Sequence, residues 1–327
     1  MDRDPADPAR FPTLEAFTRR TGIAVDYSEP IIGNEYFFSG IGVPLAMGQS
    51  PGYDLVVLSD WVIAQFIGLG WARKLSPGAV PHAAGLLPAL REGPTADLLA
   101  YSLPWEGGLT GIGYNLAATG RPVISMTDLL TAPDLQGRVT LVEDMRDNMG
   151  LIMLDHGHDP ADFTNAEFDL AVEELADAVQ RRQIRSVTNG YRDALGRGDI
   201  AACVAWTGDL LRLRRDNPDV GFALPHGGML WSDNMMILAP AQHPDEAERL
   251  MDYYYEPDVA ARLAAYMLFI CPVEGAEERL GPEHPALVYE PYVFPPPEIM
   301  AAGHYFRRLT PVENSVCQEK FSSAIGL

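Results

Sequence analysis

The chain has 327 residues and a formal charge of 24 − 45 = −21. At roughly 150 residues per domain, this length predicts about two domains, each able to bury a core. A hydrophobic fraction of 47% and a charged fraction of 21% are typical of a globular fold and argue against disorder. So acidic a chain is repelled by phosphate, which disfavours nucleic acid as a partner and suits a cationic ligand.

The sequence contains few features that indicate a membrane segment, a signal peptide or a cysteine-based site. No run of about 18 apolar residues predicts a transmembrane helix, and residues 1–10 lack the apolar segment of a signal peptide. The cysteines Cys203, Cys271 and Cys317 are too few and too scattered for a zinc cluster. One disulfide, for example between Cys203 and Cys271, and three buried thiols are equally compatible with the sequence.

Helix-like and strand-like segments alternate along the chain. Residues 11–22 predict a helix, with a proline near its start and Gly22 at its end, and residues 23–27 predict a short strand. The apolar run 54–58 predicts a buried parallel strand that opens onto a polar loop at residues 59–61.

The second half of the chain continues the alternation. Strands are predicted at residues 139–142, 200–205 and 220–224, a capping box at Thr164 and Glu167 begins one helix, and Pro244 begins another. This order predicts α/β architecture. The chain has no obvious linker, so we expect it to cross between domains more than once, with the proline-rich residues 294–297 as a rigid surface segment and not a boundary.

Tryptophans and carboxylates gather where strands are predicted to end, which is where open α/β sheets bind ligands. This inventory comprises Ser59, Asp60, Trp61, Trp105, Glu106, Asp144, Arg146, Asp147, Trp206, Asp209, Trp231 and Asp233. Aromatic faces attract an ammonium by about 0.5–2 kcal/mol, and a carboxylate adds a charge-assisted hydrogen bond. A single pair is better explained by a core tryptophan beside a surface acid, but the repetition of such pairs favours amine recognition. Trp71 is expected only to pack.

Other chemistries have weaker support. The sequence has no GxSxG, Walker or HExxH motif, and residues 107–113 are glycine-rich in an order that predicts close packing instead of dinucleotide binding. His156 and His158, with two nearby aspartates, could suggest a metal site, but a solvated turn is the favoured interpretation. Asp144 and Asp147 could form an acid/base pair, as in a glycosidase. Arg146 between them is expected to keep both ionised, which favours binding over proton transfer, and neither a metal nor a cofactor is expected.

Several segments, taken jointly and in order, match a known family. They are residues 17–25, 53–57, 101–105, 111–115, 144–147, 205–208, 227–233 and 256–260. On these segments the chain resembles the spermidine/putrescine substrate-binding proteins of bacterial ABC transporters. Asp60-Trp61 and residues 270–273 look most like the actinobacterial branch.

The resemblance implies specific ligand contacts. It implies stacking by Trp61, Trp206 and Trp231, a carboxylate pair at Asp144 and Asp147, an anchoring Asp233 near the hinge, and contacts from Ser59 and Asp60. A tyrosine of the family falls on Phe294, which keeps a ring but loses a hydroxyl. Asp60 stands where the family usually has a neutral side chain.

The family also implies the architecture. We expect the type II periplasmic-binding-protein fold, with two lobes that are each a mixed, mostly parallel sheet flanked by helices. Lobe 1 would comprise residues 1–110 and 235–327 and lobe 2 residues 111–234, with crossings near residues 111–113 and 233–234 and a ligand cleft that closes by hinge motion. Such a protein is not an enzyme. It is expected to act as a monomer and to deliver a polyamine to a membrane permease and its ATPase. The alternatives are a carboxylate-pair hydrolase and a polyamine sensor without a transport role.

The family begins with a strand of the form Asn-Trp-x-x-Tyr that carries two aromatic contacts, and this chain starts just after it. A sheet without this strand would expose unpaired backbone groups. We therefore expect Met1 to be a misplaced start. The upstream gene would then encode the strand and a secretory signal, which places the protein in the periplasm or on a lipid anchor outside the membrane.

Overall fold

The computed structural model describes residues 1–31, 33–281 and 284–326. The chain folds into two compact units. Unit 1 comprises Met1–Gly107 and Ser232–Pro295, and unit 2 comprises Gly108–Trp231 and Pro296–Leu327. The chain therefore passes between the units at three points. The first two lie within a few residues of the crossings expected from the sequence.

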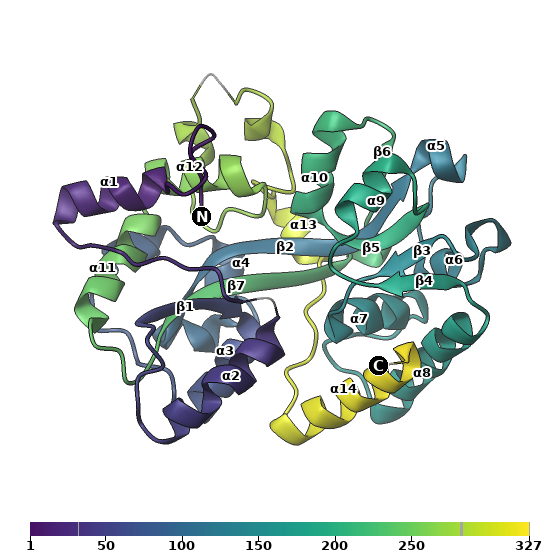
Figure 1. The fold of residues 1–327 in the computed structure, drawn as a ribbon, viewed down its shortest axis with the longest axis horizontal. Helices are drawn as coiled ribbons and strands as arrows, with labels where there is room; N and C mark the ends of the chain where they lie inside the picture. The colour runs from purple at the N-terminus through teal and green to yellow at the C-terminus, as the bar shows by residue number, and fades with distance from the viewer. Residues whose placement is uncertain (32, 282–283, 327) are drawn as a thin grey trace. The chain divides into compact units, whose positions relative to one another are not determined.

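The third crossing differs from the sequence-based expectation, which assigned residues 296–327 to lobe 1 and saw no boundary at 294–297. The division falls between Pro295 and Pro296. Helix α14 (Pro311–Ile325) then packs against α8 (Asn165–Gln180) of unit 2, beside which it lies in Figure 1. Its buried Cys317, Phe321 and Ala324 recur at helical spacing and join the core of unit 2.

Unit 1 contains an antiparallel pair of strands together with a set of helices. Strand β1 (Leu55–Ser59) pairs with β7 (Met229–Ile237), which enters unit 1 at residue 232. The predicted strand at 54–58 is therefore confirmed, but it pairs antiparallel. The helices are α1 (Pro12–Thr21), α2 (Asn34–Ala46), α3 (Asp60–Gly68), α4 (Pro88–Arg91), α11 (Pro244–Tyr254) and α12 (Pro257–Met267), with 3₁₀ turns at Pro81–Gly85, Ala96–Ala100, Glu277–Arg279 and Leu287–Tyr289.

Local sequence signals explain the first elements of unit 1. Helix α1 has a proline in its first turn and ends at Gly22, whose φ of 76° is in the left-handed region that glycine tolerates. The predicted strand at 23–27 is wrong: these residues form no ladder, although half-buried and exposed positions alternate along them. Trp71 packs against Phe38 and Phe66, as expected.

Unit 2 contains a mixed sheet. Strand β2 (Ser102–Asn115) enters it at Gly108 and pairs antiparallel with β5 (Ala202–Trp206) and β6 (Val220–Ala223), while β3 (Val139–Leu141) is parallel to β5 and β4 (Ile184–Val187). The predicted strands at 139–142, 200–205 and 220–224 are thus confirmed. The helices are α5 (Leu116–Thr119), α6 (Met126–Thr131), α7 (Met145–Asp155), α8, α9 (Arg192–Arg197), α10 (Thr207–Asp216), α13 (Pro297–Ala302) and α14, with 3₁₀ turns at Pro133–Leu135 and Pro225–Gly227.

Helix capping residues and the helical spacing of apolar residues explain the helices of unit 2. Thr164 and Glu167 make the predicted capping box of α8, whose Phe168, Ala171 and Leu175 are buried. In Figure 1, α7, α8 and α14 lie below the strands of this unit and α9 and α10 above them. Burial of the strands between helices is what positions residues at the strand ends.

The glycine-rich residues 107–113 serve close packing, as predicted. A Cβ on Gly111 would lie 2.3 Å from the carbonyl oxygen of Ala223, and one on Gly113 would lie 2.8 Å from Leu210. No side chain fits there, so glycine is required by the contact between β2 and its neighbours.

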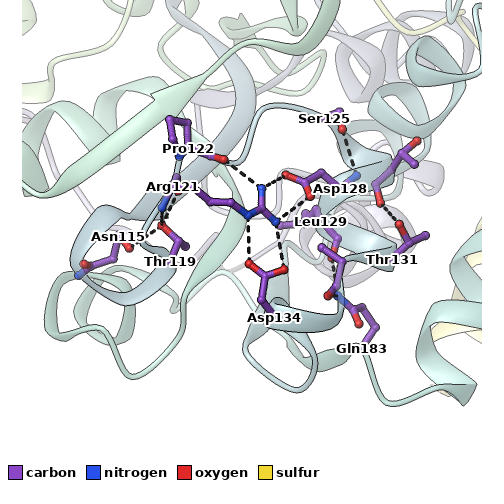
Figure 2. Close-up of polar contacts among 12 residues, drawn as sticks. Asn115, Thr119, Arg121, Pro122, Ser125, Asp128, Leu129, Thr131, Asp134 and Gln183 are labelled. Atoms are coloured by element: carbon purple, nitrogen blue, oxygen red, sulfur yellow. Dashed lines mark hydrogen bonds and ion pairs between the residues drawn. The ribbon is translucent and has the colours of Figure 1, made fainter.

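A polar cluster around Arg121 ties together α5, α6 and the turn at Pro133–Leu135 (Figure 2). Its guanidinium donates to both oxygens of Asp128, at 2.6 and 2.8 Å, and to both oxygens of Asp134, at 3.0 and 3.2 Å. These carboxylates are paired with a cation of the protein itself, and Ser125 caps α6 beside them. The cluster is therefore structural.

All three cysteines are buried free thiols, so the structure contains three buried thiols instead of a disulfide. Burial raises the pKa of the Cys203 and Cys271 thiols well above the ordinary value. Both groups are consequently protonated and unreactive at neutral pH.

Across the described parts of the chain, no helix combines the length and the apolar character needed to cross a membrane.

Candidate ligand-binding site

The aspartates at the start of α7 have different environments. Asp144 is the N-cap, and its carboxylate accepts the backbone N–H groups of residues 146 and 147. Asp147 lies one turn further on and is buried, with 7% of its surface exposed. Asp144 therefore holds the helix start, while the side chain of Asp147 is directed into a network of side chains within unit 2.

A continuous hydrogen-bond network joins three of the predicted site residues. The Trp206 indole Nε1 donates to Oδ2 of Asp147 at 2.8 Å. The Thr110 hydroxyl donates to Oδ1 of Asp147 at 2.7 Å and accepts Nε1–H of Trp231 at 3.1 Å. Both indole rings are thus held at their N–H edges around one carboxylate. Edge bonding leaves the ring faces as the surfaces suited to stacking.

Burial, together with the nearby carboxylate of Asp144, raises the pKa of Asp147 to about 8. The bonds from Trp206 and Thr110 and the charge of Arg146 act in the opposite direction but are outweighed. The expectation that Arg146 keeps both aspartates ionised is therefore wrong for Asp147. The guanidinium of Arg146 donates instead to Asn314 on α14, at 2.5 Å.

Trp206 is also fixed from its backbone side. Its amide N–H donates to the hydroxyl of Tyr191 at 3.0 Å, and that hydroxyl donates to Asp209 at 2.9 Å. The Tyr191 ring is 1% exposed and lies 6.0 Å from the Trp206 ring. Asp209, from the strand-end inventory, also pairs with Arg192 at 3.3 Å, so its role is to support Trp206.

Unit 1 builds a second carboxylate cluster. Ser59, the last residue of β1, donates its hydroxyl proton to Oδ1 of Asp233 at 2.7 Å. The Asn34 amide donates to the same hydroxyl at 2.8 Å and accepts the Ser59 backbone N–H at 3.3 Å. Asn34 is the first residue of α2, so the start of this helix is bound to the end of β1.

The other predicted contacts of unit 1 lie near these residues in sequence, with the exception of Phe294. Asp60 and Trp61 open α3 directly after Ser59, and Trp61 is half-buried against the core of unit 1. Phe294 is half-buried, and its backbone N–H bonds to Glu290 at 3.0 Å. The placement of Phe294 in a ligand site therefore stays a prediction.

The strand-end argument holds for some positions and fails for others. Ser59 and Trp206 end their strands, and Asp144 follows β3. Trp105 and Glu106 instead lie inside β2, and Trp231 and Asp233 lie inside β7. Asp233 still reaches the end of β1, because antiparallel pairing places Asp233 opposite Ser59. Sequence reasoning missed Thr110 and Asn34, which hold the two carboxylates.

Comparison with protein families decides the class of the protein. The model of the bacterial extracellular solute-binding protein family matches residues 13–286. The chain belongs to this family.

Named relatives agree with the assignment. Over 271 residues, 83% of this chain and 76% of the relative, the chain is 26% identical to the spermidine/putrescine-binding periplasmic protein of Escherichia coli. It is 27% identical over 289 residues to the putrescine/agmatine-binding protein of Pseudomonas aeruginosa, covering 78% and 73% of the two chains.

Solved structures share the fold. A spermidine/putrescine ABC transporter protein described as putative, from Listeria monocytogenes, superposes with a TM-score of 0.84 at 22% identity, covering 98% of this chain and 95% of the other. The spermidine/putrescine substrate-binding protein of Streptococcus pneumoniae gives a TM-score of 0.80 at 20% identity, covering 96% and 94%. This solute-binding protein therefore has the type II periplasmic-binding-protein fold, as predicted.

Membership in this family also bears on the enzyme alternative. The family and its structural neighbours are extracytoplasmic solute-binding proteins and not enzymes, so the carboxylate-pair hydrolase is not supported. The unequal roles of Asp144, which caps a helix, and Asp147, which receives two side-chain donors, agree with this conclusion.

The histidines near the end of α7 are engaged with carboxylates. His156 lies 2.5 Å from Glu174, and His158 lies 3.0 Å from Glu167. The described residues contain no cluster of three or more histidine, cysteine or acidic side chains arranged to hold a metal ion. These histidines connect the turn after α7 to α8.

Proposed function

We propose that this solute-binding protein captures a polyamine, such as spermidine or putrescine, for an ABC importer. The observation that carries the proposal is the pair of carboxylate clusters. One has Asp147 with Trp206 and Trp231, and the other has Asp233 with Ser59 and Trp61 close in sequence. The names of the relatives, which include spermidine, putrescine and agmatine, support the same ligand class.

The chemistry of the two clusters suits a linear diamine or triamine. A polyamine carries ammonium groups separated by methylene chains, so it needs an acidic anchor at each end and apolar faces between them. Carboxylates form charge-assisted hydrogen bonds with ammonium groups, and indole faces attract cations and cover methylenes. We infer that Ser59, Asp60, Trp61, Asp233 and Phe294 of unit 1 act together with Asp144, Asp147, Trp206 and Trp231 of unit 2 on one ligand.

The transport role defines the partners. In this proposal the two units are lobes that close around the ligand by hinge motion. The closed monomer then delivers the polyamine to a membrane permease, which is driven by its ATPase. The protein works outside the cytoplasmic membrane, in the periplasm or on a lipid anchor. The net charge of −21 supports fast capture, because an acidic surface steers a cation toward the site.

Isothermal titration calorimetry tests the proposal. We expect spermidine or putrescine to bind with a stoichiometry of one, and glutamate and a neutral disaccharide to give no heat. Asp147→Asn and Asp233→Asn should each weaken this single event. Two separate events, each abolished by one of the variants, would contradict a shared site. Binding of glutamate in place of the amines would overturn the ligand class.

A further inference from the structure

Thr110 lies in β2 between two predicted ligand-contacting residues. Its side chain is fully buried, and its hydroxyl bonds to both Asp147 and Trp231. The threonine stands within a glycine-rich strand and resembles an ordinary strand residue in the sequence. Its role therefore emerges only from the contacts.

The direction of these bonds is fixed by the chemistry of the groups. An indole N–H can only donate, so the Thr110 oxygen must accept from Trp231. The one hydroxyl proton is then available for Oδ1 of Asp147, while Trp206 donates to Oδ2. A carboxylate has about four acceptor positions, so two remain for an incoming ammonium.

We propose that Thr110 is a positioning residue that fixes the carboxylate of Asp147 and the indole of Trp231 relative to each other for ammonium binding. The inference rests on the function proposed above and deepens it. Thr110 acts through its two neighbours and need not touch the ligand.

The backbone around Thr110 is closely packed. A Cβ on Gly108 would lie 2.4 Å from Cζ2 of Trp231, and one on Gly111 would lie 2.3 Å from the carbonyl oxygen of Ala223. The backbone on both sides of Thr110 is thus in tight contact with the Trp231 ring and with β6. Such contacts restrain the strand that carries the Thr110 hydroxyl.

Unit 1 repeats the same order of groups with different residues. The amide of Asn34 donates to the hydroxyl of Ser59, which donates to Asp233. In unit 2 the indole of Trp231 donates to Thr110, which donates to Asp147. In both cases a neutral donor orients a hydroxyl, and the hydroxyl orients a carboxylate. This recurrence supports a shared purpose over an accident of packing.

The bond from Thr110 also affects protonation. The charged groups beside Asp147 are Asp144, which raises the pKa of its carboxyl, and Arg146, which lowers it. The Thr110 hydroxyl is one of the two hydrogen-bond donors that lower it. Removing this hydroxyl should therefore shift the titration of Asp147 to higher pH.

The test compares Thr110→Val, which keeps the shape and removes the hydroxyl, with Thr110→Ser, which keeps the hydroxyl. We expect T110V to weaken spermidine binding at pH 7.5 by at least about tenfold and T110S by less than about threefold, since a buried bond to a charged group is lost only in the former. In the ligand-free protein, the pH midpoint of indole fluorescence should rise in T110V and stay near the wild-type value in T110S.

Thr140→Val is the matched control. Thr140 is equally buried in unit 2, and its hydroxyl pairs with Ser186 at 2.9 Å. T140V should change neither the midpoint nor the affinity by more than about threefold. A T110V protein with wild-type affinity and midpoint would overturn the proposal, and so would equal losses in T110V and T140V. If T110V does not fold, Thr110→Ala replaces it. If the wild type binds no amine, the proposed function fails, while the ligand-free midpoint still decides the role of Thr110.

Discussion

Ser59 and Asp233 face each other across the antiparallel pair β1 and β7, and the Ser59 hydroxyl donates to the Asp233 carboxylate at 2.7 Å. The two residues are 174 positions apart in the sequence. The register of the ladder brings the end of β1 opposite the middle of β7. A serine that ends a strand thereby becomes the fixed partner of an acidic side chain.

Asp233→Asn should weaken spermidine binding by well over tenfold. The substitution keeps the size of the side chain and an acceptor for Ser59 but removes the charge, and a desolvated charge partner contributes about 2–5 kcal/mol. Calorimetry at fixed ionic strength measures the effect. Asp54→Asn is the charge-matched control: Asp54 also lies in unit 1, where it accepts backbone N–H groups of Gln242 and His243 at 2.7 and 3.0 Å. Equal affinities in the D233N and D54N variants would remove Asp233 from the site.

Local signals in the sequence predicted much of each unit. Thr164 and Glu167 specify a helix start by direct hydrogen bonds, and Gly22 stops a helix because its φ is positive. Signals of this kind depend on neighbours in the chain and need no knowledge of tertiary contacts. The aspartates and tryptophans of the proposed site were likewise selected from residue type and position at predicted strand ends, and their contact with a ligand stays a prediction.

Spermidine affinity should fall with acidity because Asp147 must lose its proton to receive an ammonium. With the pKa of Asp147 at about 8, lowering the pH from 8 to 6.5 should weaken binding roughly tenfold, while the amines remain protonated. Calorimetry in buffers with different ionisation enthalpies should also detect proton release on binding. An affinity that does not change between these pH values would contradict a titrating Asp147.

The protonation of Asp147 should affect stability in the opposite direction to spermidine affinity: stability should fall as the pH rises. Folding raises the pKa of Asp147 from about 3.8 to about 8, so between these values the folded state holds a proton that the unfolded state releases. The contribution of this group to stability is therefore greatest at acidic pH and is lost as the pH rises through 8. The Tm of D147N minus the Tm of the wild type should therefore increase between pH 5 and pH 9, as measured by thermal unfolding without ligand. A Tm difference between D147N and the wild type that does not change with pH would count against the raised pKa of Asp147.

Long-range contacts explain what the sequence could not predict. Thr110 and Asn34 are common polar residues without a local motif, and their partners lie 37 and 25 positions away. Residues 23–27 have the composition of a strand, but a strand also needs a neighbour to pair with. The assignment of residues 296–327 likewise depends on the partner of α14, which is α8 and lies more than a hundred residues earlier in the chain.

Gly108→Ala should displace the ring of Trp231 and weaken spermidine binding. An added Cβ would lie 2.4 Å from Cζ2 and 2.9 Å from Cε2 of the indole, so the ring must move. We expect a loss of about 1–2 kcal/mol, similar to Trp231→Ala, because stacking is what the displacement removes. Indole fluorescence and calorimetry measure the two effects. Gly40→Ala is the control: it lies in α2 with no atom within 4 Å of the added Cβ, and should leave binding unchanged.

Phe321→Ala should destabilise unit 2 selectively. Phe321 is 1% exposed on α14 and belongs to the core of unit 2, and truncation of a buried phenylalanine costs about 3–5 kcal/mol. Hydrogen exchange should therefore accelerate in α8, against which α14 packs, while α3 of unit 1 keeps its protection. Val312→Ala on the same helix removes a side chain that is 74% exposed and should have little effect. Faster hydrogen exchange in α3, with unchanged exchange in α8, would instead assign the C-terminal helix to unit 1, as the sequence alone suggested.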